Sequence, residues 1–158
     1  MNKKYILALI IFLLITFLAA FVGNFFTMPN IPTWYASLNK PSFSPPNWLF
    51  GPVWTILYIL MAVSAFLVWK KGEEPRIKSS LFFYFAQLLL NTAWSIAFFG
   101  LHNPFRGFLV IIALWFMIVL TMVEFWKIEK AAGILFIPYI LWVTFAAILN
   151  FAVWKLNV

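Results

Sequence analysis

Apolar residues along this chain gather in five long runs, separated by short polar or proline-rich connections. The runs cover about residues 5–26, 51–70, 79–100, 106–126 and 132–154. An α-helix rises about 1.5 Å per residue, so about 20 apolar residues cross the roughly 30 Å hydrocarbon core of a bilayer. Backbone groups cannot stay unpaired in lipid, and the runs lack the alternation that membrane-barrel strands need. The pattern therefore predicts an all-α bundle of five transmembrane helices, forming a single domain over residues 1–158.

The composition and the distribution of charge agree with a membrane protein. The chain is 65% hydrophobic and 9% charged, whereas a soluble domain of this size leaves roughly a third of its surface exposed to water. Its net charge of +7 comes from lysines and arginines clustered between the apolar runs, which is typical of membrane topology rather than nucleic-acid binding. One side of the predicted bundle holds Lys3, Lys4, Lys70, Lys71, Arg76, Lys78, Lys127 and Lys130; the other holds Lys40, Arg106 and Lys155. This bias predicts a bacterial cell-membrane protein with a cytoplasmic N-terminus and the first loop outside.

The apolar runs contain almost no side chains suited to acid–base or metal chemistry. There is no cysteine, and His102 is the single histidine, with no acidic residue beside it in the sequence. Glu124 lies near the end of the fourth run, where it can reach the headgroup region. Pumps and ion-coupled transporters normally carry ionisable groups at mid-membrane. We therefore expect no metal site and no cofactor.

Amide and aromatic side chains are the remaining candidates for a binding site. Gln87 and Asn91 are four residues apart, so they share one face of the third helix, and Trp94 continues that face. Trp54 and Tyr58 have the same spacing on the second helix. Two interpretations stay open: hydrogen bonds between helices, or the lining of a cavity for a flat apolar ligand.

The first loop combines prolines with aromatic residues, in the stretch KPSFSPPNWLFGPVW at 40–54. Proline fixes backbone angles and lowers the entropy lost on ordering. The sequence predicts that this loop is a lid over an apolar pocket, and the alternative is a loop resting on the headgroups. The residues of the predicted lid are Trp34, Pro41, Phe43, Pro45, Pro46 and Trp48.

Small residues four apart permit the close approach of two membrane helices. Ala93 and Ala97 on the third helix, or Ala19 and Gly23 on the first, would suit a homodimer.

Three longer motifs resemble a known family. WYASLNKPSFSPPNWLFGPVWTILY (34–58), QLLLNTAWSIAFF (87–99) and PYILWVTFAAILN (138–150) resemble the motifs of the tryptophan-rich sensory protein family, also called translocator proteins or peripheral-type benzodiazepine receptors. The resemblance implies a cavity that binds porphyrins, especially protoporphyrin IX or related tetrapyrroles, and synthetic isoquinoline carboxamides. Sterol binding is not expected, because no tyrosine lies between Leu149 and Lys155, where the animal members carry their sterol motif.

The resemblance also implies a set of site residues. Those that match the family's pocket are Tyr35, Trp54, Asn91, Trp94, Trp142, Phe145 and Ala146, to which the spacing argument adds Tyr58 and Gln87. Three functions stay open at this point. The protein is a membrane receptor or carrier for porphyrins and other flat ligands, a light-dependent porphyrin-degrading enzyme with Trp54 and Trp142 as catalytic residues, or a stress-linked scaffold without a ligand.

Overall fold

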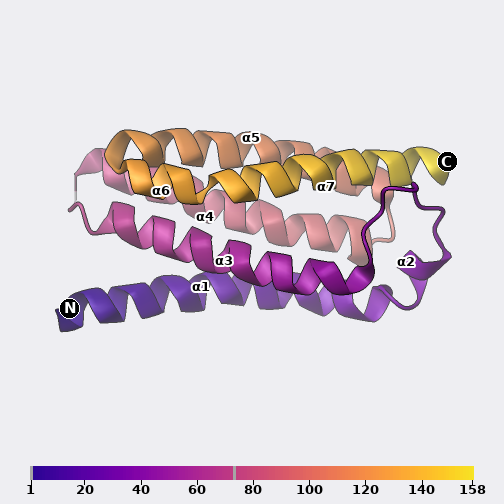
Figure 1. Cartoon of the computed structure of the whole chain (residues 1–158), viewed down its shortest axis with the longest axis horizontal. Coiled ribbons are helices and arrows are strands. Elements are labelled where there is room, and N and C mark those ends of the chain that lie inside the picture. The colour runs from indigo at the N-terminus through magenta and orange to yellow at the C-terminus, as the bar shows by residue number, and fades with distance from the viewer. Residues whose placement is uncertain (1, 73) are drawn as a thin grey trace.

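The protein folds as a bundle of long helices (Figure 1). The computed structural model describes residues 2–72 and 74–158, and every regular element within them is helical. Five helical segments are long and apolar enough to cross a membrane. The predicted all-α bundle of five transmembrane helices is therefore confirmed.

The helices begin and end within a few residues of the predicted runs. Their bounds are α1 (Lys3–Thr27), η1 (Met28–Asn30), α2 (Trp34–Ser37), α3 (Asn47–Trp69), α4 (Pro75–Ser95), η2 (Ile96–Gly100), α5 (Pro104–Ile128), α6 (Lys130–Leu135) and α7 (Ile137–Leu156). The largest differences are at the starts of α3 and α4, which begin at Asn47 and Pro75, each four residues before the predicted run, and α3 contains Pro52 near its start. Pro52 is the sixth residue of α3 and lies beyond the first four N–H groups, which lack a helical partner, so it removes one backbone hydrogen bond of the helix, as prolines inside transmembrane helices do.

Two of the predicted helices are interrupted in ways that matter for the site. The fifth run is divided into α6 and α7 at Phe136, and Pro138 occupies the first turn of α7. The third run ends in η2, a π-helical turn in which the Leu101 N–H donates to the Ile96 carbonyl at 2.8 Å. Such turns widen a helix locally and are frequent at functional sites.

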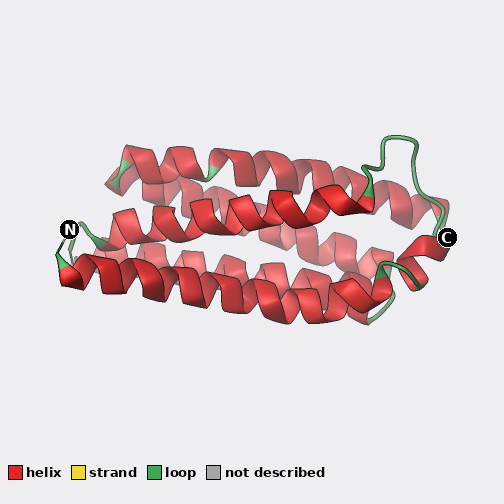
Figure 2. Ribbon diagram, turned by 60° about the horizontal axis from the view of Figure 1, so that its bottom comes forward, coloured by secondary structure: helices red, strands yellow, loops and turns green. Residues whose placement is uncertain are grey.

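The connectivity places the two ends of the chain at opposite ends of the bundle (Figure 1). Helix α4 packs against α1 and α5, α5 packs against α7, and α3 packs against α1 and α6. Figure 2 shows the irregular loop before α3 at the same end as the C-terminus. We call the segment from Ile31 to Pro46 the lid, and this end of the bundle the lid end.

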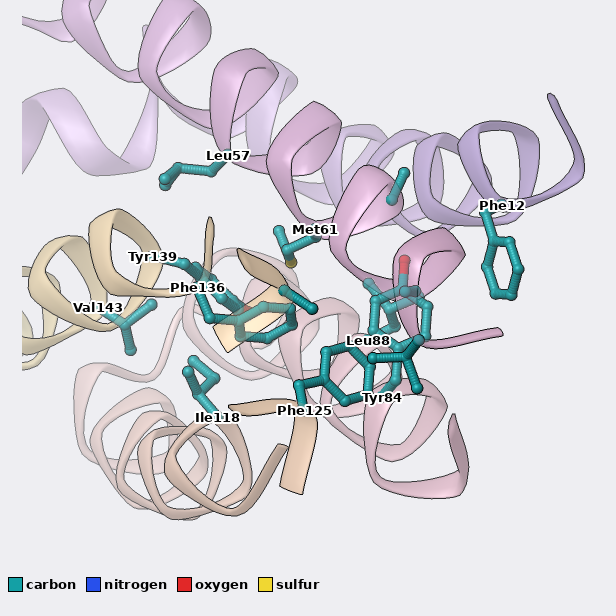
Figure 3. Close-up of a cluster of buried hydrophobic side chains, with 14 of the residues drawn as sticks. Phe12, Leu57, Met61, Tyr84, Leu88, Ile118, Phe125, Phe136, Tyr139 and Val143 are labelled. Carbon is teal, nitrogen blue, oxygen red and sulfur yellow. The ribbon is translucent and has the colours of Figure 1, made fainter. Parts of the chain in front are cut away.

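The dense core lies in the half of the bundle away from the lid. Tyr84, Phe125, Phe136 and Tyr139 are fully buried there and belong to one cluster with Met61 (Figure 3). These residues come from α3, α4, α5, α7 and the α6–α7 junction, so the core joins four of the five spans at this level. The helices are packed tightly together in the half away from the lid, whereas the half next to the lid contains a cavity.

Ion pairs join the loops at the end opposite the lid. The Lys127 ammonium lies 2.6 Å from the Glu124 carboxylate, and Lys71 pairs with Glu129, which also caps α6 by accepting from the Ala131 N–H. The hydrogen bond from Lys71, aided by the Ala131 N–H, lowers the pKa of the Glu129 carboxyl. The α3–α4 and α5–α6 connections are therefore tied to one another at this surface.

The small residues of the first helix pack within the chain. A Cβ added at Gly23 would lie 3.1 Å from the Ser95 Oγ. The Thr92 hydroxyl donates to the Ala19 carbonyl at 3.1 Å. Ala19 and Gly23 therefore let α1 approach α4, and a homodimer through this face or through Ala93 and Ala97 stays a prediction.

Candidate functional site

A cavity of about 870 Å³ occupies the half of the bundle next to the lid. Its walls come from α1, α3, α4 with η2, and α7. This volume is within the range of ligand pockets, which are typically about 300–1,000 Å³ and mostly apolar. The aromatic residues of the lining are Phe17, Phe21, Tyr35, Trp48, Phe50, Trp54, Tyr58, Trp94, Phe98 and Phe99.

The structure brings six of the nine predicted ligand-binding residues to this cavity. They are Tyr35, Trp54, Tyr58, Asn91, Trp94 and Ala146. The remaining three lie elsewhere. Gln87 is fully buried below the cavity, and Trp142 and Phe145 line a separate groove of about 390 Å³ between α3 and α7. The binding roles themselves stay predictions.

A chain of hydrogen bonds forms the floor of the cavity. The Tyr58 hydroxyl donates to the Asn91 Oδ1 at 2.7 Å, and the Asn91 Nδ2 donates to the Tyr139 hydroxyl at 3.0 Å. That hydroxyl donates in turn to the Gln87 Oε1 at 2.9 Å. The chain links α3, α4 and α7, so both interpretations of these amides apply: Gln87 joins helices, whereas Asn91 joins helices and also faces the cavity.

A second set of polar contacts fixes the wall formed by α4 and α7. The Trp94 Nε1 donates to the Asn150 Oδ1 at 3.0 Å, and the Asn150 Nδ2 donates to the Pro104 carbonyl at 2.7 Å. The Trp94 ring stacks on Phe98, with ring centroids 5.7 Å apart. Trp94 is therefore held in one orientation against the cavity.

The contribution of α1 was missed in the sequence analysis. Phe17, Phe21, Asn24 and Met28 all line the cavity, at spacings of four, three and four residues. These spacings place them on one face of a helix. An amide continuing an aromatic stripe was the signal that could have identified this face.

Helix α3 carries a comparable stripe that the sequence analysis also left out. Asn47, Gly51 and Thr55 recur every four residues before Tyr58, and all line the cavity.

The lid covers the cavity mainly through its first half. Tyr35 is only 5% exposed and lines the cavity, and Trp34 stacks on His102 with ring centroids 4.8 Å apart. Of the six residues predicted for the lid, Trp48 alone contacts the cavity, and it lies after the lid, in the first turn of α3, where it is 71% exposed. Phe43 instead packs edge-on against Phe145.

Two asparagines fasten the lid to the C-terminal end of α7. The Asn39 backbone N–H donates to the Asn157 Oδ1, and the Asn157 Nδ2 donates to the Asn39 carbonyl, both at 2.9 Å. The Asn39 Nδ2 adds a longer contact to the Leu156 carbonyl at 3.3 Å. This paired contact ties the middle of the lid to the bundle by hydrogen bonds.

Asn157→Ala is expected to loosen the lid without unfolding the bundle. It removes both contacts to the Asn39 backbone, and net contributions of such bonds are about 0.5–1.5 kcal/mol each. Hydrogen exchange of the Asn39 amide should become about tenfold faster or more, while exchange in α4 and α5 stays unchanged. Asn39→Ala is the matched control, since it keeps the backbone groups and loses only the longer contact. Equal exchange rates in Asn157→Ala and the unmodified protein would contradict this role.

Trp142 lies next to the cavity but is separated from it. Phe50 lines the cavity, and its ring packs edge-on against Trp142 at a centroid distance of 5.9 Å. The Trp142 Nε1 is buried, and within the described residues it has no hydrogen-bond partner. A buried N–H without an acceptor costs free energy, so this nitrogen is available to an acceptor group.

The cavity offers shape, aromatic surface and neutral polar groups. No charged side chain belongs to its lining among the described residues. The same part of the chain contains no group of three histidine, cysteine, aspartate or glutamate side chains close enough to hold a metal ion. What the residues present can do is enclose and orient a ligand, through aromatic contact and a few hydrogen bonds.

Comparison with known proteins agrees with the fold and with the motifs around this cavity. The sequence profile of the TspO/MBR family matches residues 11–155. The chain is 45% identical to the tryptophan-rich protein TspO of Archaeoglobus fulgidus over 96% of this chain and 98% of that protein. It is 46% identical to protein CrtK of Rhodobacter capsulatus over 78% of each chain. It is 36% identical to the human translocator protein over 89% of this chain and 84% of that protein. Together with its five membrane-spanning helices, these matches show that the chain is an integral membrane protein of the TspO/MBR family.

Proposed function

We propose that this protein is a membrane receptor or carrier that binds flat, largely apolar ligands in the cavity beneath the lid. The observation that carries the proposal is the cavity itself, about 870 Å³ with aromatic walls and a few neutral polar groups. Protoporphyrin IX or a related tetrapyrrole is the first candidate, and isoquinoline carboxamides fit the same description. The name translocator protein, carried by the human relative, is in keeping with such a role.

Aromatic residues in the walls would supply most of the contact with the ligand. Trp54 stacks on Tyr58 with ring centroids 5.5 Å apart, and Trp94 is held by Asn150. Offset or edge-on aromatic pairs contribute about 0.5–1.5 kcal/mol beyond the area they bury. A planar macrocycle offers two faces for such contacts, whereas a flexible acyl chain offers none. Asn91 would meet a polar atom at the inner edge of the ligand.

The proposed orientation places the cavity toward the outside of the cell membrane. Eight of the eleven basic residues, including Lys70 and Lys71, lie at the end of the bundle opposite the lid. Basic residues in short connections are retained in the cytoplasm. In a bacterial cell membrane, the N-terminus would then be cytoplasmic and the lid would face outward.

Binding is favoured here over porphyrin degradation by the position of one residue. The photochemical alternative needs both Trp54 and Trp142 beside the ligand. Trp54 lines the cavity, whereas Trp142 lies behind Phe50 and lines the groove between α3 and α7. Trp142 would have to relay an electron across the Phe50 ring instead of contacting the ligand directly.

Ala146→Phe tests the cavity as the binding site. Ala146 lines the cavity and is 7% exposed, so a phenyl ring there would occupy ligand space. The purified protein would be titrated with protoporphyrin IX in the dark, following tryptophan fluorescence corrected for inner-filter absorption. The unmodified protein should show saturable quenching, and the variant should bind at least about tenfold more weakly, a loss of about 1.4 kcal/mol or more.

Ile148→Phe is the matched control, because the same ring is added on the same helix at a side chain that is 56% exposed. It should bind like the unmodified protein. Linear quenching that is the same in all three proteins would mean that the porphyrin only partitions into the detergent micelle, and the proposal would fail.

A further inference from the structure

The lid end of the bundle carries basic side chains, and no acidic side chain of the described residues lies there. Its basic side chains are Lys40, Arg106 and Lys155. The acidic side chains in the described part of the chain all belong to the opposite end, where α4 begins and α5 ends: Glu74, Glu124 and Glu129. Two of these acids are already engaged there with lysine or arginine. The lid end is therefore complementary to an anion.

Lys40 is held against the roof of the cavity. Its Nζ lies 4.8 Å from the centroid of the Tyr35 ring, and Tyr35 lines the cavity. The same Nζ donates to the Leu38 carbonyl at 3.2 Å and to the Ala36 carbonyl at 3.4 Å. An ammonium group has three donors, so one N–H of Lys40 remains beyond these two contacts. The side chain is half-buried and already ordered, which lowers the entropic cost of using it for recognition.

The interior of the cavity has no charged partner for a carboxylate of the ligand. Its described lining is neutral throughout, and burying an unpaired charge is far more costly than burying a hydrogen-bonded polar group. The floor at Tyr58 is eleven residues into α3, about 16 Å from the lid end. A ligand with an apolar body and ionised carboxylates at one edge can place its body in the neutral cavity and its carboxylates beside basic side chains only with the carboxylate edge turned toward the lid.

We propose that Lys40 recognises a ligand carboxylate, so that the cavity selects flat apolar ligands bearing an ionised carboxylate at one edge over their neutral esters. The inference rests on the proposed function and assigns the ligand's orientation within the same cavity. The edge that carries no carboxylate lies toward Asn91 and Tyr58, and the carboxylate edge lies beneath the lid, beside the free donor of Lys40.

The test compares protoporphyrin IX, which has two propionates, with its dimethyl ester. Both are titrated in the dark against the unmodified protein and against Lys40→Gln. The variant should bind the diacid about tenfold more weakly, in line with the loss of a hydrogen bond to a charged group, and should bind the ester as before. Lys40→Arg keeps the charge and should retain the preference for the diacid.

Lys155→Gln is the matched control, since it removes one positive charge from the same end of the bundle. Lys155 is two positions from the cavity-lining Val153, which is about 200° around α7, so it lies on the side of the helix away from the cavity. Its Nζ lies 4.2 Å from the centroid of the Trp154 ring. Its loss should leave both affinities unchanged. An equal loss of diacid affinity in Lys155→Gln would reduce the effect to general electrostatic attraction and overturn the assignment.

Two further outcomes would overturn the role of Lys40. If Lys40→Gln weakens diacid and ester alike, Lys40 only stabilises the carbonyls at the end of α2. If it weakens neither, the carboxylate lies elsewhere. Failure of the proposed function is a different result, because the unmodified protein would then bind neither compound saturably.

Discussion

Asn91→Leu is expected to weaken both the bundle and its cavity. Asn91 is 3% exposed and is the second member of the hydrogen-bond chain that runs from Tyr58 through Tyr139 to Gln87. Leucine has the same branching and the same number of heavy atoms but no polar atom, so the Tyr58 hydroxyl would lose its acceptor. A buried polar group left without a partner costs about 1–3 kcal/mol, and hydrogen bonds between membrane helices average about 0.6 kcal/mol. We expect the free energy of unfolding to fall by about 1–2 kcal/mol.

The same change removes the polar group that faces the ligand at the cavity floor. Affinity for protoporphyrin IX should fall about tenfold, which corresponds to about 1.4 kcal/mol. Thermal unfolding in detergent, followed by circular dichroism, gives the stability, and the dark fluorescence titration gives the affinity. Asn24→Leu is the matched control, because Asn24 lines the same cavity but is exposed. A variant as stable as the unmodified protein would show that the hydrogen-bond chain does not stabilise the fold.

Gly133→Ala and Gly51→Ala are expected to change stability in opposite directions. Alanine favours a helix over glycine by about 0.5–1 kcal/mol at either position. At Gly133 the added Cβ would lie 2.7 Å from the Trp126 Cβ and 2.9 Å from the Trp126 Cα, so main chain would have to move. Overpacking of this kind costs about 1–3 kcal/mol, which outweighs the gain in helix propensity. At Gly51 nothing lies within 4 Å of the added Cβ.

Melting temperatures of the two variants measure this difference directly. A change of 1 kcal/mol shifts the melting temperature of a chain of this size by about 2–4 °C. Gly133→Ala should melt several degrees lower, and Gly51→Ala should melt at or slightly above the temperature of the unmodified protein. If both variants melt higher, α6 and the end of α5 are not as closely packed as this contact requires.

The sequence alone determined the number and approximate positions of the membrane-spanning segments. Within lipid the backbone must form its hydrogen bonds inside each segment, so a run of about 20 apolar residues crosses the membrane as a helix. The prolines at Pro46, Pro75, Pro104 and Pro138 reinforce it, because each lies at the cap or in the first turn of a helix. The four-residue spacings of Trp54 with Tyr58 and of Gln87 with Asn91 identified two helix faces as candidates for the site. In the structure these faces meet, and Tyr58 donates to Asn91.

Only the tertiary structure decided which faces of the helices enclose the cavity. Gln87 and Asn91 share a face, yet Gln87 lies below the floor and Asn91 lines the cavity. Trp142 and Ala146 are also four residues apart, yet Ala146 lines the cavity and Trp142 lines the groove between α3 and α7. In a soluble protein the apolar face of a helix marks the interior, whereas lipid is as apolar as the interior of this bundle. Hydrophobicity therefore could not distinguish the lipid-facing, core-facing and cavity-facing sides of a membrane helix, and the packing of α1, α3, α4 and α7 around the lid end determined them.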